Sequence, residues 1–287
     1  MSQVDLHLHT NFSDGRLDPF ELIEICALQG LTTISIVDHD TVDGLITAMD
    51  ACSSKNIELI NGIELGTIHN GEEIHLLGYY INQIDPSFLE TINKFKTERL
   101  IRAKNILTKL RSNGIDISWE MIELCAGNAP IGRPHFAYVM QQYGYVETPK
   151  EAFDLYLNKG RSGYVPRQLI NTVEAINLLR DNGAVPVLAH PLMSHAKSGR
   201  RGIKNLESLL TIFTSVGLQG IECYYADYDD MQINYLLKMA TTYDLIPCGG
   251  SDYHAAGNIN EPEPGDIGPP ISSVNRLKEI HFSNLKQ

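Results

Sequence analysis

The sequence predicts an α/β protein in which a parallel sheet closes into a barrel. Short β-type segments alternate with helical segments in the first and last parts of the chain, and seven strands arranged in this way are typical of a parallel sheet with helical crossovers. A glycine-rich dinucleotide fingerprint would favour an open sheet, and none follows the first strand. The strand signal fades between about Pro86 and Arg167, which indicates an inserted helical segment.

The first part of the chain contains four predicted strands and two predicted helices. Asp18 and Pro19 supply a helix N-cap and a first-turn proline for a helix that ends near Gly30. A second helix is predicted over Val42–Lys55, directly after Asp38-His39-Asp40. The strands expected here are Val4–His9, Thr33–Val37, Ile57–Ile63 and Glu73–Tyr79.

The middle of the chain contains amphipathic helical pieces, such as Leu89–Ser112, which Gly114 closes. After this middle part, strands and helices alternate again. The expected strands are Ala184–Ala189, Leu218–Tyr224 and Leu245–Gly250. The expected helices are Leu206–Val216, Asp229–Tyr243 and a segment that Thr172 caps and that ends at Gly183. The stretch from Gly257 to Pro270 is expected to be an irregular loop. We therefore expect a metal-binding barrel in residues 1–85 and 168–287 and a helical insertion, or cap, in residues 86–167.

The composition fits a folded cytoplasmic protein. The chain has 287 residues, 43% of them hydrophobic, which is enough for a large core. The N-terminal segment MSQVDLHLH lacks the features of a secretory signal, and no apolar run approaches the roughly 20 residues that span a bilayer. Five cysteines without a Cys-X-X-Cys pair suit reduced thiols. A net charge of −12 argues against duplex DNA as a partner, and we expect no membrane partner.

Histidines and carboxylates gather at the ends of the predicted strands. In a barrel of parallel strands the active site forms at the carboxyl ends, because the loops there meet around one opening. A lone histidine is more often a hydrogen-bonded core or surface residue than a ligand, but six of the ten histidines follow this pattern. The residues at strand ends are His7, His9, His39, Glu64, His75, His190, Asp252 and His254.

His7 and His9 form the clearest local signal. They are two residues apart on a strand, so both imidazoles point to the same face and can chelate one ion. Mixed imidazole and carboxylate ligands without thiolate favour manganese, zinc or iron. Two or three such ions would polarise a phosphoryl oxygen and lower the pKa of a bound water toward about 7. A metal-bound hydroxide would then attack the phosphate, and no protein nucleophile is needed.

Six segments resemble motifs of the polymerase and histidinol phosphatase (PHP) family of metal-dependent phosphoesterases. They are, in chain order, VDLHLHTNFSDG, IVDHDTVDG, NGIELG, HLLGYY, VLAHP and GGSDYH, and together they span nearly the whole chain. The resemblance implies a distorted (β/α)7 barrel, similar to a TIM barrel, with a trinuclear metal site. It assigns His7, His9, Glu64 and Asp252 to the first ion, Glu64, His75 and His190 to the second, and Asp14, His39 and His254 to the third.

Two parts of this assignment stay open. Some relatives have histidine where this chain has Asp14, so the identity and occupancy of the third ion are undecided. Two further segments, IGRPHFA at 131–137 and NKGRSGYVP at 158–166, resemble a subgroup that contains bacterial nucleoside 3′,5′-bisphosphate phosphatases and the 5′-to-3′ exoribonuclease RNase AM. The resemblance implies that Arg133 and His135 bind substrate phosphate. The alternative is that Arg133, beside Pro134, only pairs locally.

The sequence also contains two basic clusters. One consists of Lys159, Arg161 and Arg167, and the other of Lys197, Arg200 and Arg201 in the loop after His190. Most such charges are simply solvated. Because the loop after His190 lies at the expected catalytic end of the barrel, one of its cations is a candidate for a second phosphate contact. The role of His195, in the same loop, stays undecided.

The expected function is hydrolysis of phosphoric ester bonds in small phosphorylated substrates. Nucleotide 3′,5′-bisphosphates such as pAp are the first expectation, and short RNA degraded from its 5′ end is the second. Two alternatives are a small-metabolite phosphatase of the histidinol-phosphate type and a non-catalytic metal-binding module. The natural substrate, the metals and the oligomeric state are not decided by the sequence.

Overall fold

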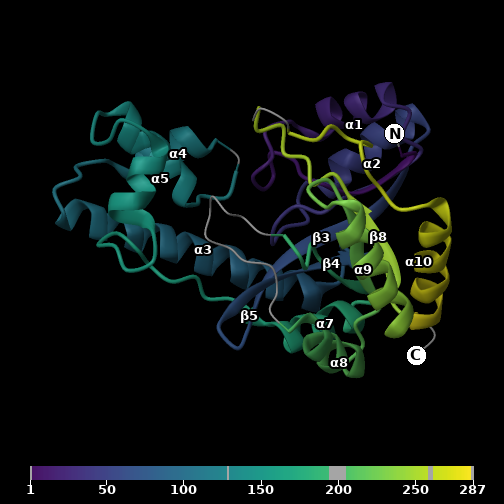
Figure 1. Cartoon of the computed structure of the whole chain (residues 1–287). Coiled ribbons are helices and arrows are strands. Elements are labelled where there is room, and N and C mark those ends of the chain that lie inside the picture. Colours follow the sequence, from purple (N-terminus) through teal and green to yellow (C-terminus); the bar gives the residue numbers. More distant parts are fainter. Residues whose placement is uncertain (1, 128, 194–204, 258–260, 286–287) are drawn as a thin grey trace. The chain divides into compact units, whose positions relative to one another are not determined.

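A computed structural model describes residues 2–127, 129–193, 205–257 and 261–285 of the chain. The chain divides into two compact units, the first formed by residues 1–89 and 169–287 and the second by residues 90–168 (Figure 1). Helix α3 (Pro86–Ser112) begins in the first unit and continues into the second.

The first unit is a nearly closed sheet, which confirms the distorted barrel. Its strands are β1 (Val4–Leu8), β2 (Thr33–Ile36), β3 (Glu58–His69), β4 (Glu72–Tyr79), β6 (Val185–Leu188), β7 (Gly220–Tyr225) and β8 (Ile246–Gly250), hydrogen-bonded in the order β1-β2-β3-β4-β6-β7-β8. The short strand β5 (Ile170–Asn171) pairs with β3. A parallel bridge between Leu8 and Tyr253 brings the two edges of the sheet together.

One strand departs from the expected parallel arrangement. Strand β4 runs antiparallel to both of its neighbours, β3 and β6. The cause is the two-residue turn Asn70-Gly71, in which both residues have positive φ angles, 50° and 82°. Asn-Gly is the preferred pair for a tight hairpin, because both residues tolerate the left-handed conformation. The sequence therefore contained a hairpin signal that the strand-by-strand prediction missed.

Helices flank the sheet of the first unit (Figure 1). They are α1 (Pro19–Leu28), α2 (Leu45–Lys55), α7 (Thr172–Asp181), α8 (Leu206–Ser215), α9 (Asp230–Thr242) and α10 (Ile271–Asn284). Asp18 caps α1, as expected, because its carboxylate accepts the backbone N–H of Glu21 at 2.9 Å. The cap of α7 is Asn171 rather than Thr172, since its side chain accepts the N–H of Val173. Helix α10 was not expected.

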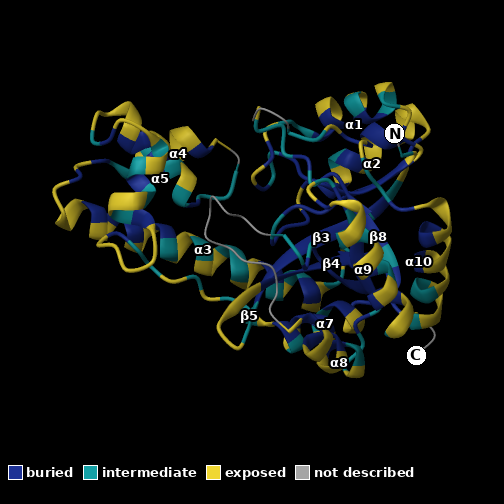
Figure 2. Ribbon diagram, viewed as in Figure 1, coloured by how far each residue is buried: buried dark blue, intermediate teal, exposed yellow. Residues whose placement is uncertain are grey.

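The strands form the buried centre of this unit, and the exposed residues lie mostly on the outer faces of the helices and in turns and loops (Figure 2). Every residue of β1, β2 and β6 is buried, as expected for strands that are covered on both sides. One apolar cluster of this unit takes residues from five strands and from α10. A strand this rich in apolar residues tolerates a polar side chain only where that side chain has a partner.

The second unit is helical in the part that the structure describes. It contains most of α3, then α4 (Trp119–Ala126), α5 (Arg133–Gln142), α6 (Pro149–Ala152) and the π-helix η1 (Phe153–Leu157). These helices share a separate apolar core, against which Trp119 packs. Among the described helices of both units, none combines the length and the apolar character needed to cross a membrane.

Candidate metal centre

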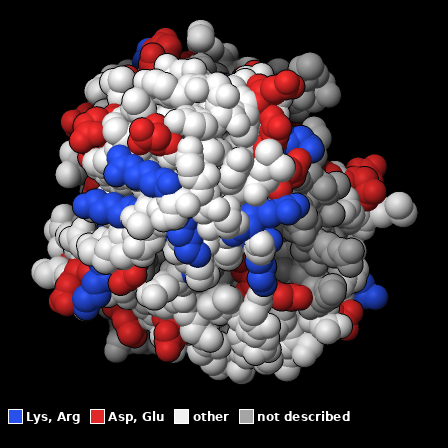
Figure 3. Space-filling view, turned by 90° about the vertical axis from the view of Figure 1, so that its left-hand side faces the viewer, with Lys and Arg blue, Asp and Glu red and all other residues white. Residues whose placement is uncertain are grey.

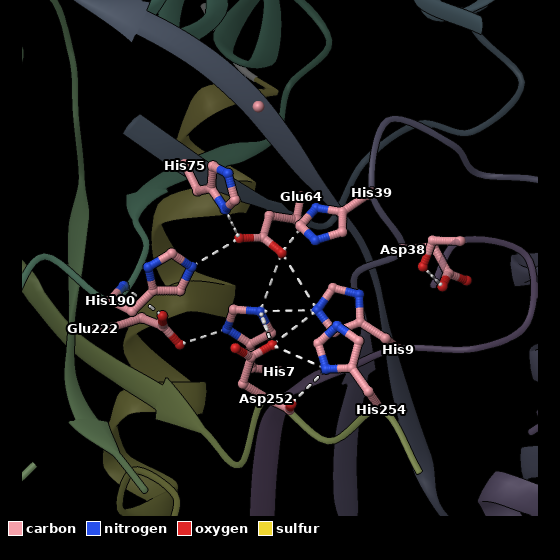
Figure 4. A network of polar contacts seen from close by, with 12 residues as sticks. His7, His9, Asp38, His39, Glu64, His75, His190, Glu222, Asp252 and His254 are labelled. Atoms are coloured by element: carbon pink, nitrogen blue, oxygen red, sulfur yellow. Dashed lines mark hydrogen bonds and ion pairs between the residues drawn. The ribbon is translucent and has the colours of Figure 1, made fainter. Parts of the chain in front are cut away.

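Nine side chains with metal-ligand chemistry were expected at one end of the barrel, and the structure brings them together. Figure 4 labels all of them except Asp14. His7 lies on β1 and His9 directly after it, His39 follows β2, Glu64 lies within β3, His190 follows β6, and Asp252 and His254 follow β8. His75 lies near the amino end of β4 and not at a strand end as expected. Because β4 is antiparallel, its amino end lies at the carboxyl ends of the parallel strands.

The first group of donors consists of His7, His9, Glu64 and Asp252. The Nε2 atoms of His7 and His9 are 3.1 Å apart, and each lies 3.1 Å from Oδ1 of Asp252. Each also lies 3.3 Å from Oε2 of Glu64. Three of the four residues are fully or almost fully buried, so the donors point into a space that is shielded from solvent.

A second group consists of His9, Asp14, His39 and His254. Nε2 of His254 lies 3.2 Å from Oδ1 of Asp14, and Nε2 of His39 lies 3.7 Å from its Oδ2. Nδ1 of His254 lies 2.7 Å from the backbone oxygen of Asp252. Because a carbonyl can only accept, this contact places a proton on Nδ1, so in the neutral ring that an ion requires the lone pair is on Nε2, the atom nearest to Asp14.

The third group is centred on Glu64 and contains His39 and His75. Oε1 of Glu64 lies 2.8 Å from Nδ1 of His75 and 3.0 Å from Nε2 of His190. Its other oxygen, Oε2, lies 3.2 Å from Nδ1 of His39. The two oxygens of Glu64 therefore face different imidazoles, and this carboxylate is the shared member of the first and third groups.

Backbone irregularities aim several of these side chains. The pairing of β1 with β2 shifts register between Asp5 and Leu8, and the pairing of β7 with β8 shifts between Glu222 and Tyr224. Such bulges redirect side chains beside functional sites. Gly250 ends β8 beside this region, and a Cβ atom there would lie only 2.4 Å from the backbone nitrogen of His7. The close approach of β1 and β8 therefore requires glycine at this position.

Unusual backbone conformations occur among and beside the donor residues. His190 and Asp252 have positive φ angles of 27° and 56°, which non-glycine residues rarely adopt. Asp40, whose Oδ1 accepts the backbone N–H of Gly66, has a φ of 54°. Strained conformations of this kind persist where the surrounding structure holds them, and they are common at functional sites.

Protonated imidazoles and ionised carboxylates stabilise each other in this cluster. Burial lowers the pKa of His9, but its contacts with Asp252 and Glu64 outweigh burial and raise the pKa to about 10. In the same way, burial opposes but the nearby carboxylates raise the pKa of His7 well above its ordinary value. Burial would raise the pKa of Glu64, yet the facing imidazoles hold it well below its usual range. His39 differs, because burial dominates and lowers its pKa to about 4.

The arrangement fits a centre for more than one divalent ion. Donors held about 2.0–2.2 Å from one ion lie about 2.8–3.6 Å apart in octahedral or tetrahedral geometry, and the donors of the first group are 3.1–3.3 Å apart. Within the described residues, Nδ1 of His9 is buried without a hydrogen-bond partner, and Nδ1 of His39 makes no hydrogen bond of acceptable geometry although Oε2 of Glu64 lies 3.2 Å away. Buried polar atoms rarely stay unpartnered, and an ion would provide the partner.

Sequence reasoning missed the polar residues that surround the ligands. Glu222 contacts His7, and the hydroxyl of Tyr225 donates to Asp252. The buried carboxylate of Asp38 accepts hydrogen bonds from Thr10 and Ser13, which lie in the loop that carries Asp14. Each of these residues is a single polar position in an apolar or ordinary loop sequence. An acid inside the apolar strand GIECYY was the one available signal.

The expected substrate-binding residues lie in the second unit, at the start of α5. Arg133 donates to the backbone oxygen of Leu157 at 3.3 Å, and its guanidinium lies 5.6 Å from the ring centroid of Phe153. Nδ1 of His135 accepts the N–H of Gly132 and so stabilises the first turn of α5. Both residues therefore have local structural contacts, whatever else they bind.

Arg133 belongs to a larger group of half-buried arginines, with Arg99, Arg102 and Arg167. Burial, together with the positive charges of Arg133, Arg167 and Arg99, lowers the pKa of Arg102 to about 10, against an opposing effect of Tyr164. Nε of Arg102 donates to the backbone oxygen of Val165. Figure 3, which views the side of the molecule with α3 to α5, shows several Lys and Arg side chains close together across the middle of this face. We refer to the four arginines as the arginine cluster.

Some expected basic residues cannot be placed. Lys197, Arg200, Arg201 and His195 lie outside the described residues. Lys159 and Arg161 are exposed near the end of the second unit.

The chain is similar in sequence and fold to several known proteins. The model of the PHP domain matches residues 5–160. A 5′-3′ exoribonuclease of Haemophilus influenzae is 31% identical over 252 residues, covering 88% of this chain and 90% of the relative. A 3′,5′-nucleoside bisphosphate phosphatase of Chromobacterium violaceum is 29% identical over 260 residues, covering 90% of this chain and 89% of the relative. The solved structure of a candidate metal-dependent phosphoesterase from Bifidobacterium adolescentis has a TM-score of 0.81 at 27% identity, with 96% of each chain covered.

Proposed function

Because the chain belongs to the PHP-domain family and is a phosphoesterase by this relationship, we propose that it hydrolyses phosphate monoesters of nucleotides with the help of two or three divalent ions. The observation that carries the proposal is the convergence of three overlapping donor groups at one end of the barrel. Glu64, His9 and His39 each belong to two of the groups, which favours ions held close to one another.

The residues have separate roles in this proposal. His7, His9, Glu64 and Asp252 would hold one ion, Glu64 with His75 and His190 would hold a second, and Asp14, His39 and His254 would hold a third. When bound, such ions polarise phosphoryl oxygens and lower the pKa of a coordinated water. The protein excludes bulk solvent, fixes the ligand tautomers and orients the donors. The metals can be manganese, zinc or iron, because the donors are imidazoles and carboxylates without thiolates.

The proposed substrate carries more than one phosphate. The ions hold the phosphate that is cleaved, so a second phosphate needs a separate cationic group. The arginine cluster is suited to this role, because a guanidinium offers paired donors that match two phosphate oxygens. Arg133, which lies in the cluster, and His135 at the start of the same helix are the proposed contacts. The neighbouring π-helix η1 supports this reading, since π-helical turns often mark functional segments.

The named relatives favour nucleotides over other phosphorylated metabolites. One is named for cleavage of RNA from the 5′ end and the other for nucleoside 3′,5′-bisphosphates, at nearly equal identity to this chain. We place the bisphosphate first, because its second phosphate is the kind of group that guanidinium side chains bind well. Short 5′-phosphorylated RNA is the second candidate, since its backbone offers the same chemistry.

A substrate panel tests the proposal. Metal-stripped protein is reloaded with Mn²⁺, Mg²⁺ or Zn²⁺ and assayed on nucleoside 3′,5′-bisphosphates, mononucleotides, 5′-phosphorylated oligoribonucleotides and histidinol phosphate. We expect phosphate release that requires added metal and is fastest with a nucleotide that carries two phosphates. Preference for histidinol phosphate would favour the small-metabolite alternative. Turnover that survives complete removal of metal would contradict the proposal.

A further inference from the structure

Glu222 is a fully buried acid that has no place in the ligand assignment above. It lies in β7 between Ile221 and Cys223, and all three residues have no exposed surface. A buried carboxylate is costly unless hydrogen bonds compensate for the lost water. The contacts of Glu222 therefore indicate why an acid is kept inside an apolar strand.

Both carboxylate oxygens of Glu222 contact proposed metal ligands. Oε1 lies 2.9 Å from Nδ1 of His7, and Oε2 accepts the backbone N–H of His190 at 2.7 Å. The carboxylate and the two residues come from three different strands and their ends, β1, β6 and β7. One side chain thus joins two residues that are proposed to hold two different ions.

The contact with His7 selects one form of its imidazole. A carboxylate accepts, so Nδ1 carries a proton, and in the neutral imidazole that an ion requires the lone pair sits on Nε2. Nε2 is the atom that lies 3.1 Å from Nε2 of His9 and 3.1 Å from Oδ1 of Asp252. The hydrogen bond therefore turns the lone pair of His7 toward the first donor group.

The contact with His190 holds its backbone. His190 has a φ angle of 27°, a conformation that costs energy for a residue with a side chain. The hydrogen bond from its N–H to Glu222 offsets part of this cost and keeps Nε2 of His190 3.0 Å from Oε1 of Glu64.

We propose that Glu222 is a positioning residue, which fixes the tautomer of His7 and the backbone of His190 and so prepares two metal positions at once. The inference rests on the metal centre of the proposed function. It is tested on metal affinity, which can be measured even if the chain hydrolyses none of the substrates in the panel.

Two variants separate positioning from general stability. Glu222→Gln keeps the shape of the side chain, but its amide can accept only one of the two N–H groups and presents a donor to the other. Glu222→Leu removes both acceptors. Ser35→Ala is the matched control, because Ser35 is equally buried in the barrel and its hydroxyl donates to the backbone of Ile60, away from the ligands.

The first measurement is Mn²⁺ affinity and stoichiometry of the metal-stripped proteins, by competition with a chelator. Loss of a hydrogen bond to a metal ligand typically weakens metal binding about 10–100-fold. The Mn²⁺ affinity of Glu222→Gln should therefore fall by a factor in this range, and that of Glu222→Leu should fall further. Ser35→Ala should keep the wild-type affinity, although its melting temperature drops. The second measurement is the ¹⁵N spectrum of His7 in the zinc-loaded protein, which should show zinc on Nε2 and the proton on Nδ1 in the wild type, and a second population with zinc on Nδ1 in Glu222→Leu.

Two results would overturn the inference. Wild-type Mn²⁺ affinity in a folded Glu222→Gln protein with a lowered melting temperature would show that Glu222 serves only the fold. A wild-type chain that binds neither Mn²⁺ nor Zn²⁺ would overturn both this inference and the proposed function. Tight metal binding in the wild type without hydrolysis of any substrate would end the proposed function alone.

Discussion

The hydroxyl of Tyr225 donates a hydrogen bond of 2.9 Å to Oδ2 of Asp252, so the remaining oxygen of this carboxylate faces His7 and His9. Tyr225→Phe removes the hydroxyl and leaves the ring in place. A hydrogen bond to a charged group contributes about 1.5–3 kcal/mol, and we expect metal affinity and kcat/KM each to fall about 10-fold or more. Tyr243→Phe is the control, because its hydroxyl donates to the backbone of Glu207, on an exposed helix surface. Equal effects of both substitutions would contradict the role of Tyr225.

Removal of a direct ligand should have a much larger effect. His7→Ala and Asp252→Ala each delete a donor of the first group, and we expect activity to fall by orders of magnitude while circular dichroism shows a retained fold. Asp244→Ala, at a highly exposed acid paired with Arg276, should leave activity unchanged. Near-normal turnover of either ligand variant, in protein with verified metal content, would rule out the ligand assignment.

The barrel and the convergence of the ligand side chains at one of its ends could be predicted from the sequence, because both depend on strong local patterns. Apolar strands that end in histidine or acid place those residues at one end of a parallel sheet, whatever the details of the loops. The direction of β4 was missed because strand propensity says nothing about pairing direction. The information lay in the turn Asn70-Gly71, whose positive φ angles force a hairpin. His75 still reaches the site, because the reversed strand begins at the correct end.

The missed elements depend on contacts between distant segments. Glu222 and His7 are 215 residues apart, and no local motif connects them. Helix α10 escaped prediction because Pro270 gives it no side-chain cap and it buries only three residues, Ser273, Val274 and Leu277. The roles of Arg133 and His135 in binding are proposals, since the contacts of Arg133 with Leu157 and Phe153 and of His135 with Gly132 serve the second unit itself.

Metal binding should release protons. In the metal-free protein the pKa of His9 is about 10 and that of His7 lies well above its ordinary value, so both imidazoles carry an extra proton at pH 7. An ion needs neutral imidazoles and must displace these protons. Metal affinity should therefore rise with pH between 6 and 8, and so should activity at limiting metal. Calorimetry of Mn²⁺ binding in two buffers with different ionisation enthalpies measures the protons released. No release at pH 7 would contradict the protonation pattern.

Stability of the metal-free protein should depend on pH in the opposite direction. The pKa values of His7, His9 and His254 are raised in the folded protein. Their contribution to the free energy of unfolding is therefore fully present below about pH 6.5, the pKa of an unfolded histidine, and is lost as pH rises toward the pKa values of the folded protein. Urea unfolding in the presence of a chelator should therefore show a lower free energy of unfolding at pH 8.5 than at pH 6.5. Metal-loaded protein should not show this loss, because ions replace the protons. A metal-free protein that gains stability over this range would contradict the prediction.

Substitution of Arg133 should separate substrate selection from hydrolysis. Arg133→Ala removes one guanidinium of the arginine cluster, and loss of a charge-assisted contact costs about 1.5–3 kcal/mol, or about one to two decades in kcat/KM. We expect this loss for a nucleoside 3′,5′-bisphosphate and a far smaller one for p-nitrophenyl phosphate, which has no second phosphate.

Arg133 is a cleaner test of substrate binding than His135, whose ring caps α5. The charge-matched control is Lys150→Ala, at an exposed lysine of the same unit. Because Arg133 also contacts Leu157 and Phe153, the melting temperature must be measured beside the kinetics. Equal losses on both substrates would mean that Arg133 acts on the phosphate that is cleaved. No loss on either would mean that its guanidinium serves only the fold of the second unit, and the proposed role of this unit in substrate selection would be wrong.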